Sequence, residues 1–154
     1  MTGVQTCALP ICDSGDRVFV LHTDDGEPTV FLSQRDVREL QFAKAAIATG
    51  WRLLLEQVGI QDADVQQVLL AGSFGSYLSP QSAIGIGLVP KLPVVRIVSA
   101  GNVAGEGAKM VLLSSTERSG AHTLLEEVEY VELSDRSDFQ DKFVDQLALP
   151  TVTR

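Results

Sequence analysis

The sequence predicts an α/β domain, on three observations. Short apolar runs rich in β-branched residues alternate with segments in which apolar residues recur every three or four positions, as on a helix. The chain has 154 residues, of which 45% are hydrophobic and 21% charged, enough to build one core. No apolar run approaches the roughly 18 residues that a membrane-spanning helix needs. We therefore expect helices flanking a sheet, in a protein without a membrane segment.

The stretch from Val65 to Pro90 is the most informative. Its apolar run Val68 to Ala71 predicts a buried strand. The next four residues, Gly72-Ser73-Phe74-Gly75, predict a tight turn whose amides a phosphate or ribose can approach, because two of them lack a Cβ. Ser79-Pro80 then predicts a helix start, with a capping hydroxyl and proline at the first helical position.

The glycine pattern alone leaves two interpretations open, a nucleotide site and an ordinary connection. A strand followed by Gly-x-x-Gly joins elements in many α/β domains without binding anything. The stretch is not a Walker A loop, because no Gly-Lys-Ser/Thr follows it. The three spaced glycines of a dinucleotide fingerprint are missing as well.

A resemblance adds to the pattern. The strand ending in LAGSFG, with the helix before it, resembles the adenosine motif of the acetate kinase, sugar kinase, heat-shock chaperone and actin superfamily (the ASKHA superfamily). Four blocks in the same order resemble the C-terminal part of the reductive activators of corrinoid proteins, which are iron–sulfur proteins that use ATP to return a corrinoid to cobalt(I). The blocks are FLSQRDVRELQFAKAAIATG, LAGSFGSYLSPQSAIGIGLVP, GNVAGEGAKMVLLS and VEYVELSDRSDFQDKFVDQL.

The resemblance implies a fold and a set of ligands. The fold is the second lobe of an actin-like (ribonuclease H-like) ATPase, a mixed sheet flanked by helices. ATP with Mg²⁺ is the implied ligand, and Gly72, Ser73, Phe74 and Gly75 are the implied nucleotide contacts. The polar residues Asp36, Arg38, Glu39 and Lys44 fall near the implied nucleotide cleft, although a charged helix face is more often simply solvated.

The resemblance also implies a setting. The implied partner is a corrinoid protein or corrinoid-dependent methyltransferase, in the cytoplasm, and a homodimer is left open. The net charge of −8 argues against nucleic acid as a partner, since acidic surfaces repel its phosphates. Two alternatives stay open: another kinase or dehydratase activator of the superfamily, and a partner-binding module that has lost nucleotide binding.

Residues 1–12, MTGVQTCALPIC, are interpreted as a non-native segment, because they resemble a translated sequencing adapter. The native lobe is then residues 13–154, a fragment of a larger protein whose catalytic residues lie upstream. Both cysteines, Cys7 and Cys12, belong to the foreign segment, so the remainder cannot hold an iron–sulfur cluster by thiolates. We expect the cluster in a missing upstream part and the fragment alone to be inactive. The histidines, His22 and His122, have no ligands at metal spacing, so no metal site is predicted.

The elements before the central stretch are a hairpin and a long helix. Arg17 to His22 and Thr29 to Leu32 are β-rich and flank the turn signal Asp24-Asp25-Gly26. Ser33 predicts the cap of a helix reaching about Gln57, with Asp36 in a capping-box position. We expect one buried apolar face on this helix, formed by Val37, Leu40, Ala43, Ile47, Trp51, Leu54 and Val58.

After the central stretch, strands and helices continue to alternate. Small residues at 101, 104, 105 and 108 predict a helix that closely approaches either a neighbouring helix or a ligand. Phe139, Phe143 and Leu147 predict a helix face packed on the sheet. The expected elements are a strand at Val94 to Val98, a helix from Gly101, a helix at Thr116 to Leu125, a strand at Val128 to Leu133 and a helix at Ser134 to Leu147.

Overall fold

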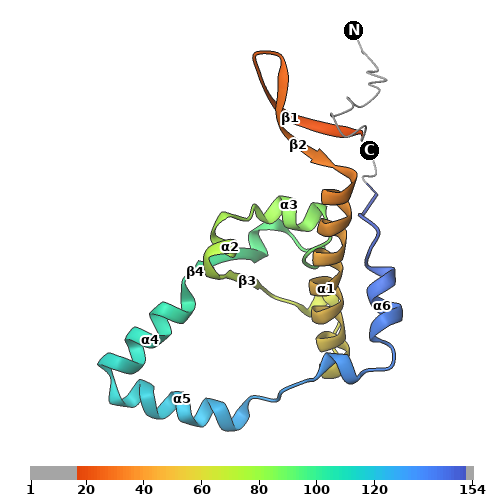
Figure 1. The fold of residues 1–154 in the computed structure, drawn as a ribbon. Coiled ribbons are helices and arrows are strands. Elements are labelled where there is room, and N and C mark those ends of the chain that lie inside the picture. The colour runs from red at the N-terminus through yellow and green to blue at the C-terminus, as the bar shows by residue number, and fades with distance from the viewer. Residues whose placement is uncertain (1–16, 152–154) are drawn as a thin grey trace. The chain divides into compact units, whose positions relative to one another are not determined.

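The structure is a computed structural model that describes residues 17–151, so residues 1–12 lie outside it. The chain falls into two compact units that divide between Ala43 and Lys44. The first unit contains a hairpin of β1 (Val18–Asp24) and β2 (Glu27–Ser33), paired antiparallel (Figure 1). Asp25 and Gly26 both adopt positive φ, 48° and 89°, as the central residues of a tight hairpin turn require. The predicted hairpin is confirmed.

The long helix α1 (Gln34–Val58) begins where the sequence predicts. Ser33 and Asp36 form a reciprocal cap: Asp36 Oδ2 accepts from Ser33 N at 2.8 Å, and Ser33 Oγ accepts from Asp36 N at 3.2 Å. The backbone hydrogen bond from Ser33 is the main reason that the pKa of Asp36 lies below its ordinary value. The carboxylate is therefore occupied by the cap.

The apolar face predicted for α1 is wrong in its register. Ile47 and Val58, both placed on the buried face, are 51% and 71% exposed. Small and polar side chains pack inward instead. The small ones let neighbouring segments approach the helix closely, and the polar ones, Lys44 and Thr49, make hydrogen bonds to distant backbone carbonyls. The buried residues of α1 are Lys44, Ala45, Ala48, Thr49 and Leu53.

The second unit is built around two parallel strands, β3 (Val68–Ala71) and β4 (Ile97–Gly101). The strand β4 starts three residues later than predicted, because Val94–Arg96 form a 3₁₀ turn (η2) after Pro93. Ile97 is the buried member of the new strand and joins a core with Ala83, Leu88 and Val89. The helix α3 (Pro80–Gly85) lies against this core.

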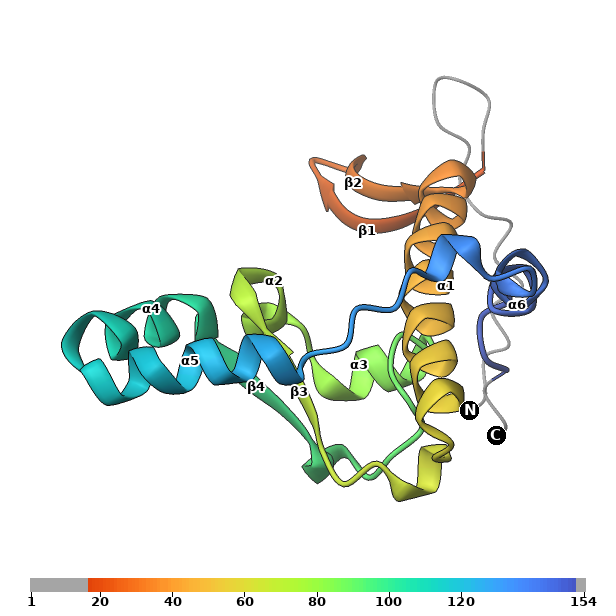
Figure 2. The ribbon, with the colours of Figure 1, turned by 90° about the horizontal axis from the view of Figure 1, so that it is seen from below.

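Two helices follow β4 and pack against each other. They are α4 (Val103–Leu113) and α5 (Ser115–Glu127), seen together in Figure 2. Ser114 ends the first helix and caps the second, with its Oγ accepting from Glu117 N at 3.2 Å. The predicted helix at Thr116 to Leu125 is confirmed.

The predicted C-terminal elements are partly wrong. Val128 to Leu133 is not a strand: Val128 and Tyr130 are exposed, and a 3₁₀ turn, η3 (Leu133–Asp135), follows. The final helix α6 is shorter than expected, Phe139–Asp145. It lies along α1 rather than on the sheet, and Lys142 pairs there with Glu56 (Figure 1).

The strands of the described residues form two small sheets, the antiparallel β1–β2 pair in the first unit and the parallel β3–β4 pair in the second. Among residues 17–151, no helix has the length and apolar character that a membrane crossing requires.

Candidate functional site

The four predicted contact residues lie directly after β3. They do not form a tight turn, as the sequence suggested, because Gly72–Tyr77 is a short helix, α2. Gly72 makes the sharp change of direction from strand to helix, with φ of 84° after an extended Ala71. Ser76 Oγ donates to Gly72 O at 3.0 Å and closes the first turn.

The two glycines of this stretch have different roles. A Cβ added to Gly75 would lie 2.7 Å from Leu70 C and 2.8 Å from Leu70 O, so the bare glycine lets α2 pack on the backbone of β3. A Cβ added to Gly72 would meet nothing within 4 Å. Gly72 therefore borders open space, whereas Gly75 is buried and not accessible to a ligand.

The outer side of α2 is exposed and aromatic. Phe74 is 73% exposed and Tyr77 is 93% exposed, and Ser73 is exposed between the glycine and the first ring. An exposed serine hydroxyl, free approach to Gly72 and an aromatic surface are groups that a nucleoside can contact. The candidate surface is thus Gly72, Ser73 and Phe74.

The next helix starts as predicted. Ser79 Oγ accepts from Ser82 N at 3.4 Å, and Pro80 occupies the first helical position of α3. The Ser79 hydroxyl therefore serves as the cap of a six-residue helix.

The small residues opening α4 also have a local explanation. A Cβ on Gly105 would lie 2.6 Å from Asn102 Nδ2, because the Asn102 side chain folds over the helix start and its Oδ1 accepts from Gly105 N at 3.1 Å. Space for this cap accounts for the glycine.

The polar residues predicted near the cleft do not behave as one group. Asp36 is engaged in its cap in the first unit. Lys44 belongs to the second unit, where it is only 2% exposed and its Nζ donates to Ala148 O at 2.6 Å. The sequence pattern placed Lys44 on a charged helix face, and that placement is wrong.

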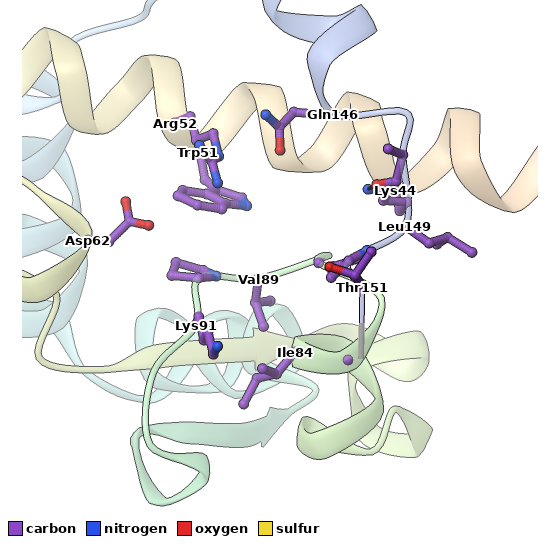
Figure 3. Close-up of a pocket in the computed structure, with 15 residues that line it drawn as sticks. Lys44, Trp51, Arg52, Asp62, Ile84, Val89, Lys91, Gln146, Leu149 and Thr151 are labelled. Atoms are coloured by element: carbon purple, nitrogen blue, oxygen red, sulfur yellow. Dashed lines mark hydrogen bonds between the residues drawn. The ribbon is translucent and has the colours of Figure 1, made fainter. Parts of the chain in front are cut away.

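Lys44 lines a cavity of about 550 Å³ that the sequence did not predict (Figure 3). The Trp51 ring faces the loop carrying Val89 and Lys91, with Asp62 to one side and Leu149 and Thr151 to the other (Figure 3). Trp51 Nε1 donates to Leu88 O at 3.1 Å, and the Arg52 guanidinium lies 5.0 Å from the indole centroid. Residues 72–75 do not line this cavity. Among the described residues, no group of three or more His, Cys, Asp or Glu side chains is placed to hold a metal ion.

A family model described as the C-terminal domain of RACo, the ASKHA domain, matches residues 7–154. The chain belongs to this family. Its fold and the resemblance stated from the four blocks are thereby confirmed.

Two relatives support the same assignment. The chain is 36% identical over 135 residues to the corrinoid activation enzyme RamQ of Eubacterium limosum, covering 86% of this chain and 23% of RamQ. A solved structure of a reductive activator for corrinoid, iron-sulfur protein superposes with a TM-score of 0.75 at 28% identity. That match covers 94% of this chain and 23% of the solved chain. The chain thus spans under a quarter of the relatives that it matches.

Proposed function

We propose that this chain is the ATP-binding C-terminal lobe of an iron–sulfur protein that uses ATP to reactivate corrinoid methyl-transfer proteins reductively. The observation that carries the proposal is membership of the corrinoid-activator ASKHA family over residues 7–154. The names of both relatives support the same partner class, a corrinoid protein or corrinoid-dependent methyltransferase. A cytoplasmic location and a homodimer belong to the same proposal, and microscopy of tagged protein and sedimentation velocity test them.

The residues present fit a nucleoside in part. Gly72 borders open space, and Ser73 and Phe74 are exposed beside it, so we assign nucleotide contact to these three residues. Gly75 completes the predicted set by positioning α2 against Leu70, not by touching the ligand. When bound, ATP would supply the phosphoanhydride whose hydrolysis drives the uphill reduction of the corrinoid.

The same residues do not fit Mg²⁺ or a cluster. No described residue from Gly72 to Tyr77 carries a carboxylate, and residues 17–151 contain no group of three or more His, Cys, Asp or Glu side chains placed to hold a metal ion. From Asp13 onward the sequence has no cysteine. We therefore assign magnesium to no residue from Gly72 to Tyr77, and the iron–sulfur cluster to no residue from Asp13 onward.

Binding by this lobe alone is expected to be weak. Exposed dipolar contacts are worth about 0.3 to 1 kcal/mol each, whereas a millimolar ligand needs about 4 kcal/mol and a micromolar one about 8 kcal/mol. The chain should bind ATP no more tightly than about 1 mM. It should not hydrolyse ATP, since the stretch from Gly72 to Tyr77 has no carboxylate to hold a metal ion or orient a water.

An ATP titration followed by amide chemical shifts tests this proposal. We expect shifts at Gly72 to Phe74, and we expect Ser73→Glu to remove them by placing a larger, negatively charged side chain at a contact with the anionic nucleotide. Ser119→Glu, at an exposed position on α5, is the matched control and should leave them unchanged. In the complete protein, Ser73→Glu should slow ATP-dependent cobalt(I) formation, followed by corrinoid absorption. If the same amide shifts appear in the Ser73→Glu variant, the stretch from Gly72 to Phe74 is not part of the nucleotide site.

A further inference from the structure

The cavity beside Trp51 carries an excess of positive charge in an acidic chain. Its lining includes Lys44, Arg52 and Lys91 but a single carboxylate, Asp62, whereas the chain as a whole has a net charge of −8. With about 550 Å³ it has room for a small organic ligand. None of its lining residues is part of the Gly72 to Phe74 surface.

Lys44 is held in place at one wall of the cavity. Its ammonium has three donors, one of which goes to Ala148 O. A Cβ on Gly87 would lie 3.0 Å from Pro150 Cγ and 3.7 Å from Lys44 Nζ, so the glycine lets Pro150 pack at this wall beside the ammonium. Burial lowers the pKa of Lys44, and the positive charge of Arg52 lowers it further. A bound anion would offset both effects.

Arg52 is ordered in a different way. Its guanidinium lies over the Trp51 ring at 5.0 Å, a cation–π distance, and the Trp51 indole is itself fixed to Leu88 O. A guanidinium held in this way presents a planar set of donors that matches carboxylate and phosphate oxygens. Two cations of α1 thus lie beside the same cavity.

We propose that this cavity binds a small organic oxyanion with two or more negative charges, contacted by Lys44 and Arg52 and assisted by Lys91. Phosphate-bearing and carboxylate-bearing ligands share this chemistry. The competing explanation is that Lys44 only docks the segment around Ala148 onto α1. That explanation accounts for Lys44 but not for the two further cations, Arg52 and Lys91, on the lining of the same cavity.

The single tryptophan of the chain lines the cavity, so its fluorescence reports on binding there. We would titrate the 154-residue chain with pyrophosphate and, separately, with citrate, at fixed ionic strength. We expect saturable quenching by at least one of them. Tighter binding of pyrophosphate would identify a phosphate-bearing ligand, and tighter binding of citrate a polycarboxylate; either result supports the site.

Three variants make the test specific. Lys91→Gln and Arg52→Gln, both at exposed positions, should each weaken binding about tenfold, the loss expected for one charge-assisted hydrogen bond. Lys109→Gln makes the same charge change at an exposed pair with Glu106 on α4, away from the cavity, and should leave the affinity unchanged. Thermal melts confirm that each variant is folded.

Two results would overturn the proposal. One is the absence of saturable quenching by either anion up to about 10 mM, a concentration at which even a ligand with millimolar affinity is mostly bound. The other is an equal loss of affinity in Lys109→Gln and Lys91→Gln, which would show general attraction to surface charge. Neither result bears on ATP binding at Gly72 to Phe74, because those amides are followed separately.

Discussion

The indole nitrogen of Trp51 and the carbonyl of Leu88 join two segments that are 37 residues apart, with Nε1 donating to O at 3.1 Å. Leu88 belongs to the core around β3 and β4, while Trp51 lies in the middle of α1. This hydrogen bond therefore fastens the part of α1 that belongs to the second unit to the core of that unit.

Replacing Trp51 by phenylalanine should destabilise the fold. The substitution leaves the Leu88 carbonyl, in a buried residue, without its donor, at a cost of about 1 to 3 kcal/mol. Urea denaturation followed by far-UV circular dichroism measures the change. The control is Tyr130→Phe, which removes an exposed hydrogen bond to Glu132 and should shift the unfolding free energy by under about 0.5 kcal/mol. Equal losses of unfolding free energy in the two variants would mean that the Trp51–Leu88 hydrogen bond contributes no more than an exposed one.

Gly75→Ala should be destabilising, and Gly120→Ala should not. The new Cβ at position 75 would lie 2.7 Å from Leu70 C, so α2 has to move away from β3, costing about 1 to 3 kcal/mol. Gly120 lies within α5 with nothing within 4 Å of its Cβ position, and alanine there should stabilise by about 0.5 to 1 kcal/mol. Thermal unfolding of the two variants, compared side by side, decides whether Gly75 is a packing glycine.

Ser33→Ala should loosen the start of α1. The loss of a serine cap costs about 0.5 to 2 kcal/mol, and here the hydroxyl also donates to Asp36 Oδ2 at 2.7 Å. Faster hydrogen exchange at the first-turn amides of α1 is the expected result, with exchange in the middle of the helix unchanged. Uniform acceleration along the helix would instead indicate global destabilisation.

The ionic cluster near α6 should make the second unit sensitive to acid. Arg136 donates to both carboxylate oxygens of Asp138 at 3.0 Å, and Lys142 Nζ lies 3.3 Å from Asp138 Oδ2. The hydrogen bonds from Arg136, with a smaller contribution from Lys142, hold the pKa of Asp138 well below its ordinary value. A lowered carboxyl pKa contributes stability that is present above about pH 4 and is lost as the pH falls through the folded-state pKa.

In Asp138→Asn the urea midpoint should therefore fall less between pH 5 and pH 2 than it does in the unaltered chain. Arg136→Gln should reduce the pH dependence in the same way. The double substitution should add little to either single one, because both remove the same Arg136–Asp138 interaction. Two additive effects would show that the carboxylate and the guanidinium act independently.

Local chemistry made part of this fold predictable. Asp25-Gly26, Ser33 with Asp36, and Ser79 with Pro80 each act through neighbours within a few residues, and each does what the sequence suggested. The strand before Gly72 could also be predicted, because its apolar run is short and bounded, but its predicted burial is wrong: no residue of β3 is buried, and Leu69 is 60% exposed.

Non-local contacts account for the errors. Lys44 is buried and donates a hydrogen bond to Ala148 O, 104 residues away. The periodicity of a single helix carries no information about such a distant partner. Alternation between Val128 and Leu133 resembled a strand, yet no other strand pairs with it among the described residues. The cavity was missed for the same reason, since its walls come from α1, the loop around Val89 and the segment around Leu149.

The bonds from α1 to the later chain also set an order of events during synthesis. Lys44 Nζ can donate to Ala148 O only after Ala148 has been synthesised. Thr49 Oγ1 likewise needs the carbonyl of Lys142, 93 residues later in the chain. The helix itself is local and forms early, but its buried ammonium has no place to dock until residues 142–148 have left the ribosome. A nascent chain stalled before that point would leave the inward face of α1, with Lys44, Ala45, Ala48, Thr49 and Leu53, open to solvent on the side that residues 142–148 later cover.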